Sequence, residues 1–283
     1  MIFPILRTEA RGILSATTGF IRNAGFTHSL SPARNCTFGC SYCYVPTMGI
    51  YGGLKPEDVR HWGQMTTFKS NAAALLHKEL RPNQRIYCSP VVDPYQPAEE
   101  QERMMPALLE ALIHNPPHVF TIQTRGPLIL RDLDLIKELS QRTRLHVSFS
   151  VCTDDEKIRR IYEGRCATFH ERLRVLQALA VANIRAFATI APVLPCNPEN
   201  FAKSLLERTS GGIICDPLHV RATKPHGATT RDAAWRIAQQ HGHQQWFDAA
   251  FQATIAERIG TVVNAAGRKF GIGWEAFSWL AEF

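Results

Sequence analysis

Residues 36–43 read Cys-Thr-Phe-Gly-Cys-Ser-Tyr-Cys, so three cysteines lie within eight residues in a C-x3-C-x2-C arrangement. The stretch follows a run at 26–30 (FTHSL) that is typical of a β-strand. Thiolates are soft ligands, which indicates zinc, copper or an iron–sulfur cluster. A structural zinc ion takes four protein ligands, so His28 or a distant cysteine would have to complete the site. An iron–sulfur cubane held by three cysteines keeps one iron open to a small molecule, which suits chemistry better than scaffolding.

On either side of this stretch, the chain alternates between segments with strand-like and segments with helical hydrophobic patterns. Runs rich in β-branched and apolar residues predict five more strands, at 85–92, 118–124, 144–152, 184–192 and 212–220. Helical spacing appears at 67–80, 97–114, 132–141 and 169–182, and a further helix is expected to begin at Pro198. Six strands alternating with helices predict parallel βαβ units, but the pattern fits an open sheet and a complete or partial barrel equally well.

Composition narrows the class of protein. The chain has 283 residues, 45% of them hydrophobic, and 32 Lys+Arg against 25 Asp+Glu give a net charge of +7. This composition excludes a mostly disordered chain. No apolar run approaches the roughly 18–20 residues that span a bilayer, which excludes a membrane-spanning protein. The N-terminus lacks the features of a secretory signal, so we expect a cytoplasmic protein with no membrane partner. Eight cysteines in a reducing compartment favour metal binding or catalysis over disulfides.

The predicted strand at 144–152 has an unusually polar face. His146, Ser148, Ser150 and Cys152 alternate with apolar residues along it. A polar face on a strand inside an α/β layer favours the lining of a cavity. The alternative is that these small polar groups form hydrogen bonds with their neighbours.

The cysteine triplet, together with Tyr42 and the repeated β/α pattern, resembles the radical S-adenosylmethionine (SAM) superfamily. Further blocks fall in the order seen in its spore photoproduct lyase-like members: Val92–Pro97, Gln123–Arg125, Leu130–Asp132, Glu163–Arg165 and Ala191–Pro195. The resemblance spans about residues 26–220. Val92 stands where a threonine is usual, which removes a hydroxyl contact. Gly164 and Ala167 replace prolines, which affects the shape of the loop that contains them.

The resemblance implies a fold and a chemistry. The fold is an α/β partial (β/α)6 TIM-type barrel over residues 26–220, with an N-terminal extension over 1–25 and a helical C-terminal extension over 221–283. Cys36, Cys40 and Cys43 would ligate a [4Fe–4S] cluster, and SAM would chelate the open iron. An electron donor such as flavodoxin or ferredoxin would reduce the cluster, and SAM would be cleaved to a 5′-deoxyadenosyl radical that abstracts hydrogen from an unidentified substrate.

The resemblance and the strand ends together nominate SAM-binding residues, because β/α folds place their sites at the carboxyl ends of strands. Arg125 is expected to pair with the SAM carboxylate, or else to be a solvated surface residue. Asp93 is expected to accept from an amino or hydroxyl group, or to cap the turn at Pro94. Tyr42 is expected near the adenine, with simple packing as the alternative. The remaining candidates are Ser89, Thr124, Ser148 and Ser150.

Cys88 receives a separate prediction. It falls, followed by Ser89, at about the position where spore photoproduct lyase carries a hydrogen-donating cysteine, so it is predicted to quench a product radical. The alternative is a small buried hydrophobic residue, the usual role of a free cysteine in a strand. The remaining cysteines are too dispersed for a second cluster motif, so one cluster per chain is expected.

Two other functions remain open at this point. Repair of a DNA lesion is compatible with the excess of basic residues, but the sequence contains no dense basic patch interleaved with aromatic residues. Nucleic acid is therefore possible but not indicated. A non-catalytic metal-binding adaptor would also retain the cysteine loop. After residue 221 the sequence predicts helices at 231–241 and 244–259, followed by an aromatic tail at 271–280. The aromatic residues of these segments would cover the open side or the bottom of the barrel, or bind a partner.

Overall fold

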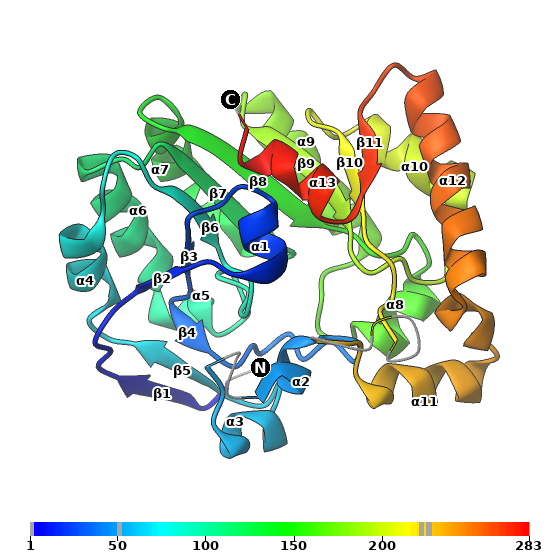
Figure 1. Ribbon diagram of the computed structural model, residues 1–283, viewed down its shortest axis with the longest axis horizontal. Coiled ribbons are helices and arrows are strands. Elements are labelled where there is room, and N and C mark those ends of the chain that lie inside the picture. The colour runs from blue at the N-terminus through cyan, green and yellow to red at the C-terminus, as the bar shows by residue number, and fades with distance from the viewer. Residues whose placement is uncertain (1–2, 50–52, 221–223, 225–227, 283) are drawn as a thin grey trace.

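The computed structural model describes residues 3–49, 53–220, 224 and 228–282. One sheet contains eight strands in the order β11-β10-β9-β8-β7-β6-β3-β2 (Figure 1). Seven of these strands, all except β2 (Leu14–Ala16), are parallel. Six of the seven follow one another in chain order and lie within the six predicted runs: β3 (His28–Leu30), β6 (Arg85–Cys88), β7 (Val119–Thr124), β8 (Arg144–Ser150), β9 (Arg185–Ile190) and β10 (Ile213–Cys215). The alternation of parallel strands with helices gives the predicted partial (β/α)6 barrel.

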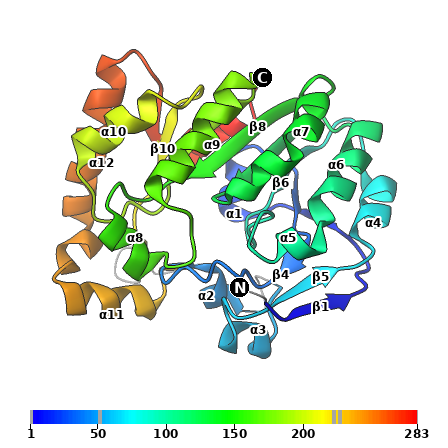
Figure 2. The same ribbon diagram turned by 180° about the vertical axis from the view of Figure 1, so that it is seen from behind.

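Helices cover the outer face of this sheet (Figure 2). They are α4 (Ala72–Glu79), α6 (Met104–His114), α7 (Leu133–Ser140), α9 (Phe169–Val181) and α10 (Pro198–Leu206), with shorter turns at η2 (Pro127–Asp132), α5 (Glu99–Glu102) and α8 (Glu156–Tyr162). Local signals explain their starts: a capping box between Thr168 and Glu171 begins α9, and Asn197 caps α10 ahead of Pro198, as expected from the sequence. None of the helices in the described ranges has the length and apolarity needed to cross a membrane.

Three short strands, one from the N-terminal extension and two from later segments, form a second, smaller sheet next to the barrel. Its strand order is β1-β5-β4, formed by Ile5–Thr8, Thr66–Lys69 and Ala33–Arg34. The helix expected at 67–80 is therefore corrected at its start: Thr66–Lys69 is a buried strand that pairs on both sides, and the helix begins at Ala72. Strand β2 (Leu14–Ala16) pairs antiparallel with β3, and α1 (Gly19–Asn23), α2 (Val45–Met48) and α3 (Pro56–Arg60) complete this region.

The C-terminal segment is mainly helical but also extends the sheet. It contains α11 (Asp232–His241), η3 (Gln244–Phe247), α12 (Ala249–Ala265), β11 (Phe270–Ile272), α13 (Gly273–Phe277) and η4 (Ser278–Leu280). The sequence predicted no strand here, yet β11 pairs parallel with β10, because three residues are too short a run to show strand periodicity. Trp246 and Phe247 are buried, whereas Trp235 is 40% exposed.

Residues 276–281 close the amino-terminal end of the barrel. Phe277 and Leu280 pack in one apolar cluster with Tyr87 and Phe187, which lie on the inner face of the strands. The carbonyl of Leu280 accepts a hydrogen bond from the Thr121 hydroxyl (2.7 Å) and is 3.0 Å from Nδ1 of His146. The C-terminal segment therefore covers the bottom of the barrel, one of the positions expected from the sequence.

Candidate active site

The cysteine loop begins immediately after β4, at Asn35. This side chain is fully buried, and its Nδ2 donates to the carbonyls of Asp58 (2.9 Å) and His61 (3.1 Å). Its Oδ1 accepts from the backbone N–H of Cys36 (2.8 Å) and of Gly63 (3.1 Å). Asn35 has a φ of +62°, a conformation that asparagine tolerates better than most residues. One side chain thus fixes the start of the loop to residues 58–63.

Two further contacts hold the middle of the loop. The Gln96 side-chain oxygen accepts from the backbone N–H (2.7 Å) and the hydroxyl (3.0 Å) of Thr37. Gly39 has a φ of +61°, and a Cβ there would lie 2.9 Å from Cα of Gly63. The guanidinium of Arg165 donates to the carbonyls of Gly63 and Thr37. The close approach of two backbones, together with the positive φ, explains the glycine between the first two cysteines.

The three predicted ligands present thiols in different environments along this loop. Cys36 and Cys40 are buried, and Cys43 is partly buried. Burial raises the pKa of Cys36 and raises that of Cys43 to about 12. Backbone N–H groups act in the opposite direction: that of Asp93 on Cys36 and that of Val45 on Cys43. Such N–H donors stabilise a thiolate ligand.

A buried carboxylate lies beside the loop, between two arginines. Glu163 Oε1 is 2.5 Å from Arg125 Nη1, and its Oε2 is 2.6 Å from Arg172 Nη2. Burial alone would raise the pKa of Glu163, but Arg172 and Arg125 outweigh it and bring the pKa to about 2. Glu163 is therefore ionised at neutral pH, and the three groups carry one net positive charge next to the cysteine loop.

Tyr42 joins this charged group to the loop between Cys40 and Cys43. Its hydroxyl donates to Glu163 and accepts from Arg125, whose guanidinium carbon also lies 5.6 Å from the centre of the Tyr42 ring. Burial raises the pKa of Tyr42 well above its usual range. The arrangement fixes the position of the segment between the second and third cysteines.

Asp93, Thr124 and Arg125, three of the predicted SAM contacts, form one network. The Asp93 carboxylate accepts from the Thr124 hydroxyl (2.5 Å), from the backbone N–H of Arg125 (2.8 Å) and from that of Tyr95 (2.9 Å). Burial raises the pKa of Asp93, and the hydrogen bond from Thr124 opposes this shift. The network joins the carboxyl ends of β6 and β7 beneath the cysteine loop.

The three predicted serines are buried and hydrogen-bonded to other side chains. Ser89 pairs with Ser31 (3.0 Å) and Ser148 with Thr189 (2.6 Å), while Ser150 accepts from Gln123 (2.7 Å). The polar face of β8 therefore takes part in hydrogen bonds between neighbouring strands. These distances are contacts within the protein, so the SAM-binding roles of the three serines stay predictions.

Cys88 lies on the face of β6 opposite to Tyr87. It has no exposed surface and belongs to the large apolar core, whereas Tyr87 belongs to the cluster inside the barrel. Burial raises the pKa of its thiol. The environment is that of a buried small side chain, and the hydrogen-donor role of Cys88 stays a prediction.

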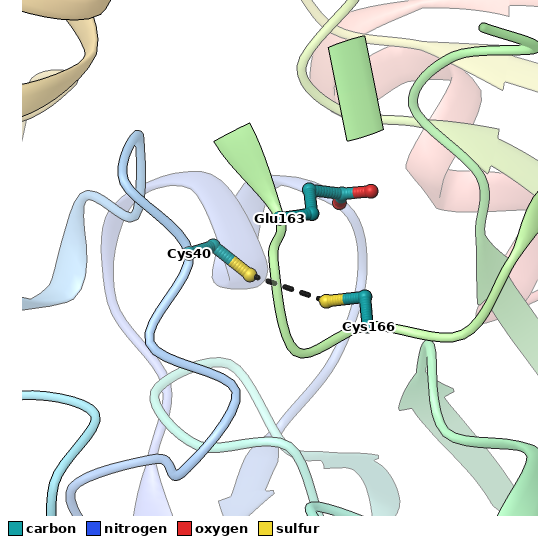
Figure 3. Close-up of side chains that lie close together, drawn as sticks. All are labelled: Cys40, Glu163 and Cys166. Carbon is teal, nitrogen blue, oxygen red and sulfur yellow. Dashed lines mark hydrogen bonds between the residues drawn. The ribbon is translucent and has the colours of Figure 1, made fainter. Parts of the chain in front are cut away.

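Cys166, which the sequence analysis left without a role, lies next to a predicted ligand. The sulfurs of Cys40 and Cys166 are 3.7 Å apart (Figure 3). A hydrogen bond with Cys166 lowers the pKa of Cys40 to about 7. The two sulfurs and a carboxylate oxygen of Glu163 lie within 4.8 Å of one another. Both Glu163 oxygens already bind guanidinium groups that would repel a cation, so this trio is a poor site for a single metal ion.

The donor set of the loop fits an iron–sulfur cluster. Three thiols come from one short segment, backbone N–H groups act to lower the pKa of Cys36 and Cys43, and nearby arginines offset the negative charge of thiolates. Sulfur ligands with hydrogen-bond donors around them are typical of such clusters. Cys36, Cys40 and Cys43 are the residues that would hold it.

Comparison with known proteins identifies the class. Residues 30–206, well over half of the chain, match the model of the Radical SAM superfamily, and the chain belongs to that superfamily. The superfamily implies a [4Fe–4S] cluster and SAM. A protein of Mycobacterium tuberculosis, described as uncharacterized, is 31% identical over 174 residues, which is 60% of this chain and 50% of that protein. One of Methanocaldococcus jannaschii, also described as uncharacterized, is 26% identical over 171 residues, covering 60% and 62%. The chain thus spans about half the length of the mycobacterial relative.

Solved structures of similar fold include spore photoproduct lyase. One of its mutants superimposes with a TM-score of 0.56 at 12% identity, over 85% of this chain and 80% of that one. The lyase complexed with dinucleoside spore photoproduct gives a TM-score of 0.55 at 12% identity, over 83% and 79%. At this identity the likeness concerns the fold, which is the radical SAM partial TIM barrel in both proteins.

Proposed function

We propose that this chain is a radical SAM enzyme in which Cys36, Cys40 and Cys43 hold a [4Fe–4S] cluster. The observation that carries the proposal is the cysteine loop, fixed through Asn35 and Gln96 at the carboxyl end of a partial barrel. With SAM bound, such a cluster supplies a 5′-deoxyadenosyl radical that abstracts hydrogen from a substrate. The protein would bind SAM and the substrate, orient them and exclude water.

We assign the predicted SAM residues to two roles. Ser89, Ser148 and Ser150 offer short hydroxyl side chains on or beside the inner face of the barrel and would bind SAM or substrate. Asp93 and Thr124 support the others, because the carboxylate already accepts three hydrogen bonds that join two strand ends. These assignments rest on the contacts of the side chains within the protein.

Arg125 and Tyr42 make a third group in this proposal. The ion pair with Glu163 engages one guanidinium nitrogen of Arg125. Arg125 would therefore keep the Tyr42 segment in place while offering positive charge to the SAM carboxylate. Tyr42 would hold the loop on which the adenine is expected to rest.

The substrate and the electron donor belong to the same proposal. A small electron carrier such as flavodoxin or ferredoxin would supply the electron. We assign no DNA lesion as substrate, because the likeness to spore photoproduct lyase is one of fold, at 12% identity. The substrate class stays open.

Anaerobic reconstitution tests the proposal. The protein is incubated with iron and sulfide, reduced with dithionite in the presence of SAM, and assayed for 5′-deoxyadenosine. We expect about four irons per chain and formation of 5′-deoxyadenosine. Cys36→Ala should abolish both, whereas Cys215→Ala, a buried cysteine on β10, should retain both. A protein that binds zinc tightly and never cleaves SAM would be an adaptor, and the proposal would be wrong.

A further inference from the structure

We propose that Cys166 donates an S–H···S hydrogen bond to the ligating sulfur of Cys40 and thereby raises the reduction potential of the cluster. The inference rests on the proposed function, because it requires Cys40 to be an iron ligand. Cys166 acts through Cys40, so it is a positioning residue rather than a catalytic one.

The geometry of the pair supports a hydrogen bond. The sulfurs are 3.7 Å apart and face each other (Figure 3). Each cysteine is only 6% exposed. A thiolate bound to iron carries no proton, so in the loaded protein only Cys166 can be the donor. Burial strengthens this interaction, because water does not compete for either sulfur.

Hydrogen bonds of its own N–H and carbonyl hold the backbone of Cys166 in place. Its N–H donates to the carbonyl of Glu163 (2.8 Å), and its carbonyl accepts from Nη1 of Arg159 (2.7 Å). Arg159 also donates to the carbonyl of Glu163 (3.2 Å). A hydrogen-bonded turn thus holds the backbone that carries the Cys166 thiol next to Cys40.

Cys40 differs from the other two ligands in its side-chain neighbours. Within the described residues, it is the one predicted ligand whose sulfur lies within hydrogen-bond distance of another thiol, that of Cys166. Substitution of Cys166 removes this donor without changing a ligand, which makes its effect measurable.

The direction of the effect follows from charge. Reduction adds one electron to the cluster and increases the negative charge on its sulfur ligands. A donor to one of those sulfurs stabilises the reduced state more than the oxidised state, so it raises the reduction potential. A thiol is a weak donor, and the expected change is accordingly modest.

The test compares four reconstituted proteins: wild type, Cys166→Ala, Cys166→Ser and Cys215→Ala. Iron and sulfide content are measured first, and each loaded cluster is then titrated against redox mediators, with the reduced fraction followed by electron paramagnetic resonance. We expect all four to load. In Cys166→Ala the ratio of reduced to oxidised cluster at a given solution potential should fall about three- to tenfold, tenfold being about 59 mV for one electron.

The control variants separate a hydrogen bond from a packing effect. Cys166→Ser keeps a hydroxyl donor and should restore most of the wild-type potential, and Cys215→Ala should match wild type. An unchanged potential in a loaded Cys166→Ala protein overturns the inference and leaves the proposed function intact. Loss of the cluster from Cys166→Ala also overturns the inference, because it would make Cys166 a ligand. An equal shift of the reduction potential in Cys215→Ala overturns it as well. Failure of the wild-type protein to hold a cluster overturns the proposed function instead.

Discussion

Replacement of Glu163 by glutamine tests the buried charge group beside the cysteine loop. The carboxylate has no exposed surface and lies within 2.6 Å of the guanidinium groups of both Arg125 and Arg172. These arginines bring its pKa to about 2 from the ordinary 4.5 against the opposing effect of burial, and a difference of this size corresponds to about 3 kcal/mol of folding free energy. Glu163→Gln should therefore lower the free energy of unfolding at neutral pH by about 3 kcal/mol, because the buried Arg172 and the partly buried Arg125 lose their counterion.

The pH dependence gives an independent measure of the same energy. In the unfolded chain Glu163 titrates near its ordinary pKa, and in the folded chain near 2. Its contribution is therefore complete above about pH 5 and decreases as the pH falls toward 2. The difference in stability between wild type and Glu163→Gln should shrink over that window.

Urea unfolding followed by far-UV circular dichroism, from pH 7 down to pH 3, measures both quantities. Glu138→Gln is the matched control, since Glu138 pairs with Arg142 one helical turn away and both side chains are about half exposed. It should change stability by no more than about 0.5 kcal/mol. The reasoning is refuted if Glu163→Gln loses less than about 1 kcal/mol at pH 7, or if its deficit is independent of pH.

Three further predictions concern the loop and the nearby strand. Asn35→Ala removes a side chain with four hydrogen bonds to the backbone, so it should lower stability by about 2–3 kcal/mol in urea unfolding and lower the iron content after reconstitution. Gly39→Ala should also reduce iron per chain, because its Cβ would lie 2.9 Å from Gly63; Gly267→Ala, at a positive φ with open space around it, should not, and equal losses in the two would contradict the steric argument. Cys88→Ala, assayed with the true substrate once it is known, should leave product formation unchanged, because Cys88 lies in the apolar core on the face of β6 opposite to Tyr87; loss of product while 5′-deoxyadenosine still forms would instead support the predicted hydrogen-donor role.

The sequence was sufficient for the strands and helices of the barrel because their signals are local, whereas the partial barrel itself followed from the family resemblance. Six strands show runs of apolar and β-branched residues, and the helices between them carry their own start signals, such as Thr168 with Glu171. The strands that were missed are two to four residues long and are stabilised by pairing with distant segments. Thr66–Lys69 is one example, since it pairs with Ile5–Thr8 in sequence far upstream.

The site was predictable only in part, for a related reason. The cysteine loop is visible in its spacing, but its neighbours depend on how the chain returns to it. Arg125 was expected to meet SAM, and in the structure its guanidinium forms an ion pair with Glu163. Cys166 lies 126 positions from Cys40 and belongs to no spacing pattern. A weak signal was present, because Cys166 directly follows the Glu163–Arg165 block that resembled a family motif.

The closure of the barrel by residues 276–281 has a consequence for folding during synthesis. The carbonyl of Leu280 bonds to the hydroxyl of Thr121, 159 positions earlier in the chain, and lies 3.0 Å from Nδ1 of His146, 134 positions earlier. The apolar cluster that includes Tyr87 and Phe187 therefore stays partly uncovered until residues 276–281 have been made.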